Sequence, residues 1–191
     1  MSSLLFIVGA VVLWFFPLWA FRAPKSRLGG FDQRDWPTGR NLVFTILDVV
    51  RASVGGWLMA RGLVGLPNWP FGVAWMSEAW LALALGLALT AQAFYWHTED
   101  YLQAPVAFLA GALSAIVHPA VLLLGLPLAI GAALAIRAWS ACFVGASVGL
   151  IGIGMVVTGQ DWRRTVLLGA AVNLPVLASM LAGRHLGGAR K

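Results

Sequence analysis

Residues Leu102 to Val157 read LQAPVAFLAGALSAIVHPAVLLLGLPLAIGAALAIRAWSACFVGASVGLIGIGMVV, a stretch of 56 residues with no acidic side chain and only two basic ones, His118 and Arg137. Apolar runs above about 18 residues indicate membrane-spanning helices, because a globular interior does not require them. As a helix this stretch would extend about 84 Å, close to three crossings of a roughly 30 Å hydrocarbon core. The sequence therefore predicts an integral membrane protein.

Two natural breaks divide this stretch. Proline fits the first turn of a helix, so a new span is expected to begin at His118-Pro119, and Arg137 carries the only full charge. Further apolar runs lie on both sides of the stretch. The expected fold is an all-α polytopic transmembrane helix bundle forming one integral membrane domain over residues 1–191. The predicted spans are 4–21, 41–64, 75–96, 102–118, 120–137, 138–157 and 165–183.

The basic residues indicate the orientation of these spans. Five lie in the loop that follows the first span, and no basic residue precedes that span, which argues against a signal peptide. Seven spans with the N-terminus outside place this loop, Arg137 and the C-terminal tail in the cytoplasm, as the positive-inside rule requires. A six-span alternative, with one tilted and broken helix between Gln103 and Arg137, places the basic tail outside. We prefer seven spans, in a bacterial cytoplasmic membrane.

Composition restricts the partners. The chain is 60% hydrophobic and 10% charged, with a net charge of +6 and ten tryptophans. Its basic residues flank apolar runs and form no continuous patch, so we expect anionic lipid headgroups as partners and no nucleic acid. Cys142 is the only cysteine and offers neither an intramolecular disulfide nor a thiolate metal cluster.

Asp48 and Arg51 are the most costly residues in the sequence, because they lie well inside the second span. Their spacing of three places them on one helical face, where they can pair. One interpretation is an ion, proton or anionic-substrate site, and the other is a mutually neutralised pair that holds this helix to its neighbours. Asn173 interrupts the last span beside Pro175 and joins the candidate buried polar site, although a buried Asn usually holds helices together.

Small residues recur every four positions in three spans, a spacing that lets helix backbones approach closely. Close approach builds either a rigid monomeric bundle or an oligomer interface. The candidate packing residues are Ala52, Gly56 and Ala60 in the second span, Ala107, Gly111 and Ala115 in the fourth, and Gly145 and Gly149 in the sixth.

No sequence motif in the chain specifies a catalytic, nucleotide-binding or metal-binding site. We therefore name no catalytic residue and expect no metal and no cofactor. The leading hypothesis is a non-enzymatic subunit or scaffold that contacts lipid and other membrane proteins, or copies of itself. The first alternative is a small transporter or channel with a midplane site at Asp48 and Arg51, and the second is an intramembrane enzyme acting on a lipid-phase substrate.

Overall fold

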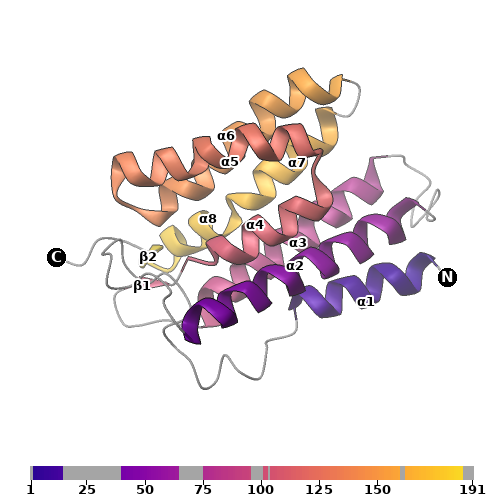
Figure 1. Cartoon of the computed structure of the whole chain (residues 1–191), viewed down its shortest axis with the longest axis horizontal. Helices are drawn as coiled ribbons and strands as arrows, with labels where there is room; N and C mark the ends of the chain where they lie inside the picture. The colour runs from indigo at the N-terminus through magenta and orange to yellow at the C-terminus, as the bar shows by residue number, and fades with distance from the viewer. Residues whose placement is uncertain are drawn as a thin grey trace.

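The computed structural model describes residues 2–14, 40–64, 75–95, 101–102, 104–159 and 162–186. These residues form a helix bundle with one pair of very short parallel strands (Figure 1). The all-α class is therefore confirmed. The helices are α1 (Ser2–Trp14), α2 (Arg40–Val64), α3 (Met76–Tyr95), α4 (Val106–Ile116), α5 (Pro119–Ile136), α6 (Trp139–Thr158), α7 (Trp162–Val172) and α8 (Leu174–Leu181), and the strands are β1 (Tyr101–Leu102) and β2 (His185–Leu186).

The predicted count of about seven spans agrees with these helices, because α7 and α8 are one rod interrupted at Asn173. Four rods are long and apolar enough to cross a membrane: α3, α5, α6 and the combined α7–α8, with 18 to 20 residues each. Such helices are about 27–30 Å long, which matches the hydrocarbon core. Helix α2 has 25 residues and carries the charged pair. Over the residues that the structure describes, helices α1 and α4 are apolar but shorter than a full crossing.

The fourth span is shorter than predicted. We expected a helix over 102–118, but α4 has only 11 residues and begins at Val106. Pro105 disfavours a helical conformation at Ala104. Before it, β1 pairs in parallel with β2 near the C-terminus, and both Leu102 and Leu186 are buried. For the first span, residues 15–21 lie outside the described ranges, as do most of the basic loop and the C-terminal tail.

The two predicted breaks are where helices end. The His118 side chain caps α5, its Nδ1 accepting a hydrogen bond from the Ala120 amide at 3.3 Å, and Pro119 lies in the first turn. At the other end of α5, Arg137 adopts a left-handed conformation with φ of 57°. Helices α4 and α5 thus run in opposite directions around a tight turn (Figure 1), which excludes the single broken helix of the six-span alternative.

Side chains on the outer surface of the bundle are strongly apolar. Leu123 is 73% exposed, Val156 85% and Leu181 91%, and many other large apolar residues share this surface. In water such a surface would be an aggregation site, whereas a hydrocarbon solvent removes the cost. Exposed tryptophans Trp57 and Trp162 lie toward one end of the bundle, each under an arginine guanidinium, as in an interfacial aromatic belt.

Candidate buried polar site

Asp48 and Arg51 lie on α2 at the middle of its length. At 1.5 Å per residue, Arg51 is about 17 Å from the first residue of α2 and about 20 Å from the last. The side chains of Arg51 and Asp48 are only 10% and 14% exposed. This burial explains why both charged groups need partners within the protein, since a buried charge without a partner is costly.

One carboxylate oxygen of Asp48 accepts two hydrogen bonds from Arg51. The Asp48 Oδ1 atom lies 2.7 Å from Arg51 Nη2 and 3.1 Å from Arg51 Nε. The pairing follows from the helical spacing of three residues, which places the two side chains next to each other. Charge-assisted hydrogen bonds of this kind are roughly twice as strong as neutral ones.

Arg51 also binds the backbone of α1, which sequence reasoning missed. Its Nη1 donates to the carbonyl oxygens of Val12 at 3.1 Å and Leu13 at 3.2 Å. Pro17 has no amide hydrogen, so the Leu13 carbonyl four residues earlier has no α-helical partner in the sequence. A cation at the C-terminal end of a helix also opposes the helix dipole favourably. Arg51 therefore supplies the Leu13 carbonyl with a donor that Pro17 cannot provide, and it also donates to the Val12 carbonyl.

The same guanidinium contacts a third helix. Its central carbon lies 5.1 Å from the ring centroid of Phe108 on α4, a buried side chain, in a cation–π arrangement. Arg51 thus connects α1, α2 and α4 from one position. This geometry can hold three helices together without any bound solute.

Asn173 does not join this site. It lies between α7 and α8, which pack against α3, whereas α2 packs chiefly against α1 and α4. Its Oδ1 atom is buried and has no hydrogen-bond partner among the described residues. Pro175 removes the amide that would bond the Ala171 carbonyl, and that oxygen lies 3.0 Å from where a Cβ at Gly86 of α3 would be. Of the three residues grouped from the sequence, Asp48 and Arg51 thus form an ion pair, whereas Asn173 lies at a separate break between α7 and α8.

Close backbone contacts surround the pair on α2. A side chain at Gly56 would meet the Ala112 carbonyl at 3.1 Å, and one at Gly111 would run into the backbone of Val49. Ala52, which lies between Val49 and Gly56 on α2, is fully buried. Ser53 of α2 donates to the Gly111 carbonyl at 2.9 Å, and its hydroxyl lies 3.1 Å from that of Ser114. Helices α2 and α4 therefore meet through backbone and hydroxyl groups.

The other candidate packing residues divide into two groups. A Cβ at Gly145 or Gly149 of α6 would lie 3.0 Å from the α5 backbone, at Ala129 and Gly125 respectively, so α5 and α6 also approach closely. Ala60, Ala107 and Ala115 are half-buried. Sequence reasoning missed the tightest contacts of α1 with α2, at Gly9, Gly55 and Gly62. The seven-residue spacing of Gly55 and Gly62 could have indicated them.

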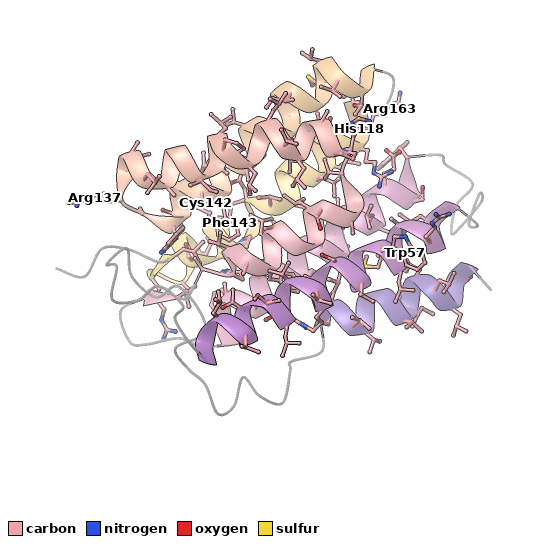
Figure 2. All side chains as sticks on the ribbon, in the orientation of Figure 1. Trp57, His118, Arg137, Cys142, Phe143 and Arg163 are labelled. Atoms are coloured by element: carbon pink, nitrogen blue, oxygen red, sulfur yellow. The ribbon has the colours of Figure 1, made fainter. Side chains whose placement is uncertain are left out.

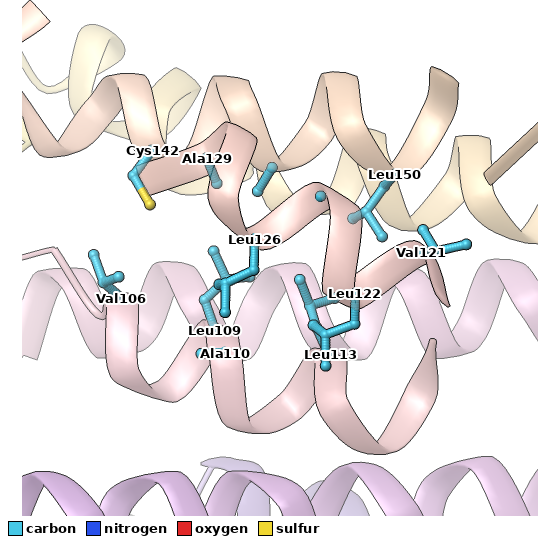
Figure 3. Close-up of a pocket in the computed structure, with 12 residues that line it drawn as sticks. Val106, Leu109, Ala110, Leu113, Val121, Leu122, Leu126, Ala129, Cys142 and Leu150 are labelled. Atoms are coloured by element: carbon cyan, nitrogen blue, oxygen red, sulfur yellow. The ribbon is translucent and has the colours of Figure 1, made fainter. Parts of the chain in front are cut away.

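An apolar cleft lies between α4, α5 and α6 (Figure 3) and contains about 390 Å³ of empty space, its open mouth included. Leu109 and Leu113 of α4, Leu122 and Leu126 of α5 and Cys142 of α6 are among the residues that line it. Neither Asp48 nor Arg51 lines it. Sequence reasoning did not anticipate this cleft.

No known protein family, curated protein or solved structure matches the chain. Among the described residues, no three His, Cys, Asp or Glu side chains gather in a way that could hold a metal ion.

Proposed function

We propose that the protein is a non-enzymatic polytopic membrane protein that works as a packed subunit or scaffold within a membrane complex. The observation that supports this proposal best is how Arg51 is used. Its guanidinium bonds Asp48 and two carbonyl groups of α1 and stacks on Phe108, so the costly charge serves helix packing. Helices associate in lipid through such polar and close backbone contacts, because apolar surface alone provides little driving force.

The proposal is tested by the assembly state and by transport. We expect the chain, extracted from its native membrane in mild detergent, to migrate as a defined assembly larger than its 20.3 kDa monomer. Native mass spectrometry would distinguish copies of the chain from other subunits. A stable monomer would contradict the proposal, and so would a purified chain that moves a solute across liposomes unaided.

One observation favours transport as a second candidate function. The last span is broken at Asn173, where a buried side-chain oxygen lacks a hydrogen-bond partner among the described residues. Discontinuous helices form substrate and ion sites in many transporters. If the protein transports a solute, Asn173→Ala should abolish flux in liposomes while Asn41→Ala, at the start of α2, leaves it intact. Equal flux in the two variants would remove Asn173 from any transport role.

We further propose that the protein resides in a bacterial cytoplasmic membrane with its N-terminus outside and its C-terminus in the cytoplasm. The first described residues of α1 and the strand β2 lie at opposite ends of the bundle (Figure 1), which supports an odd number of crossings. Cysteine labelling in a Cys142→Ser background tests the orientation. A cysteine at Arg190 should react only after the membrane is permeabilised, and its labelling in intact cells would contradict the orientation.

A further inference from the structure

The apolar cleft ends beside a group of basic side chains. Its wall residues Leu113 and Leu122 lie within about one helical turn of the α4–α5 turn at His118. Arg164 reaches this turn from α7, where its Nη2 donates to the Ile116 carbonyl at 2.7 Å. The next residue in the chain toward the N-terminus, Arg163, is exposed, and Figure 2 shows His118 and Arg163 at the same end of the bundle.

These basic groups can contact an anion. The guanidinium carbon of Arg163 lies 5.7 Å from the Trp162 ring centroid, which holds the charge at the level expected of an interfacial tryptophan. His118 uses Nδ1 to accept from the Ala120 amide, so its hydrogen is on Nε2, on an exposed ring. Arg164 has further donors beyond the one used at Ile116. A phosphate at this end of the cleft would meet donors from two helices.

The shape of the cleft fits an acyl chain better than a helix. Its walls extend from Val106 to Leu113 on α4 and from Val121 to Ala129 on α5, about 11–12 Å in each case. The space between these walls is only wide enough for a water-sized group, so the cleft is a narrow groove and a helix about 10 Å wide does not fit inside it.

We propose that the cleft and its basic end bind one anionic phospholipid, with an acyl chain along α4 and α5 and the phosphate beside Arg163, Arg164 and His118. The proposal rests on charge complementarity at one end of an otherwise apolar, partly open groove. It also gives a role to Arg163 and Arg164. The seven-span topology places these two arginines on the outer side of the membrane, against the positive-inside rule. Lipid binding at this place does not depend on whether the protein is a complex subunit.

Photocross-linking tests the site. The full-length protein is reconstituted with a phosphatidylglycerol that carries a diazirine midway along one acyl chain, and unlabelled phosphatidylglycerol or phosphatidylcholine competes. We expect cross-links concentrated on cleft residues of α4, α5 and α6. Phosphatidylglycerol should compete better than phosphatidylcholine, and each arginine that contacts the phosphate should contribute a factor of about five to this preference. Arg163→Gln should reduce this preference about fivefold.

Arg61→Gln is the matched control. Arg61 also stacks over an exposed tryptophan, Trp57, but on α2, whose residues do not line the cleft. This variant should keep the wild-type preference. Ala110→Leu, which adds volume inside the cleft, should lower cross-linking by both lipids, and a thermal melt verifies that each variant is folded. Equal competition by the two lipids on the wild-type protein would overturn the proposal, and so would cross-links spread evenly over exposed residues such as Leu123 and Leu181.

Discussion

Helices α2 and α5 both pack against α4, and they do so in different ways. Helix α2 meets α4 through Gly56, Gly111 and the hydroxyls of Ser53 and Ser114, and it carries the charged pair. Helix α5 has no charged or hydroxyl side chain, makes close contact mainly with α6, and leaves a cleft against α4. Lipid tails are as apolar as leucine, so apolar side chains alone do not hold two helices together. The contrast indicates that polar and backbone contacts decide which helices close on each other.

The largest effect is expected from Arg51→Gln. The change leaves the largely buried Asp48 carboxylate without its cation and removes the donor to the Val12 and Leu13 carbonyls. Breaking a buried ion pair from one side costs about 3–5 kcal/mol, so we expect a loss of this size in the free energy of unfolding. Reversible unfolding in mixed detergent micelles provides the measurement.

Asp48→Asn is the matched control for this change. An asparagine oxygen can still accept from Arg51, and Arg51 keeps the α1 carbonyls, whose partial negative charge favours a cation. The loss in stability should therefore be smaller than for Arg51→Gln. If Asp48→Asn is equally damaging, the contacts of Arg51 with α1 contribute nothing, and the ion pair alone explains its burial.

The second prediction compares a glycine at the close contact of α4 with α2 and a glycine on α5. Gly111→Ala would bring a methyl group against the Val49 backbone and force α2 and α4 apart, at a cost of about 1–3 kcal/mol. Gly131→Ala on α5 meets nothing within 4 Å. It should instead stabilise the helix by about 0.4–1 kcal/mol, because alanine restricts the unfolded chain. A lower melting temperature for Gly111→Ala and a higher one for Gly131→Ala would support the difference between the two helix contacts. Equal losses of stability in the two variants would contradict it.

The third prediction concerns Arg164, which donates a hydrogen bond to a backbone carbonyl of α4 as Arg51 does to carbonyls of α1. Each arginine donates to carbonyls in the last turn of a short helix, but Arg164 is nearer a helix end and binds a single carbonyl. A cation at a helix C-terminus contributes about 0.3–1 kcal/mol, so Arg164→Gln should cost far less than Arg51→Gln. Unfolding of both variants under the same conditions tests the ranking. An equal loss would show that the additional contacts of Arg51 do not distinguish it from Arg164.

Much of the fold could be predicted from the sequence, because span length, proline position and charge act locally. The break at His118-Pro119 needed only the fit of proline to a first helical turn. The pairing of Asp48 with Arg51 needed only helical spacing. The short fourth span was missed although Pro105 indicated a break, because the apolar run continues through it, and the pairing of β1 with a strand more than 80 residues away could not be predicted.

The surroundings of the candidate site were also beyond the sequence. Pro17 indicates that the Leu13 carbonyl needs a partner, but not that Arg51 supplies it, because the donor comes from another helix. Asn173 was grouped with the charged pair because it too is polar within a span. Residue type does not reveal which helices are neighbours, and α2 and α7 pack mainly against different ones.

The smallest expected effect is at the hydroxyl contact between α2 and α4. The oxygens of Ser53 and Ser114 lie 3.1 Å apart, and each also lies within hydrogen-bonding distance of the Gly111 carbonyl, so the single hydrogen of one hydroxyl is donated to the other while the second hydroxyl donates to that carbonyl. Hydrogen bonds between membrane helices contribute about 0.6 kcal/mol on average, because the separated helices also find polar partners. A double-mutant cycle of Ser53→Ala and Ser114→Ala should give a coupling of this size. Strict additivity would mean that close backbone approach at Gly56 and Gly111 holds α2 to α4 without help from the hydroxyls.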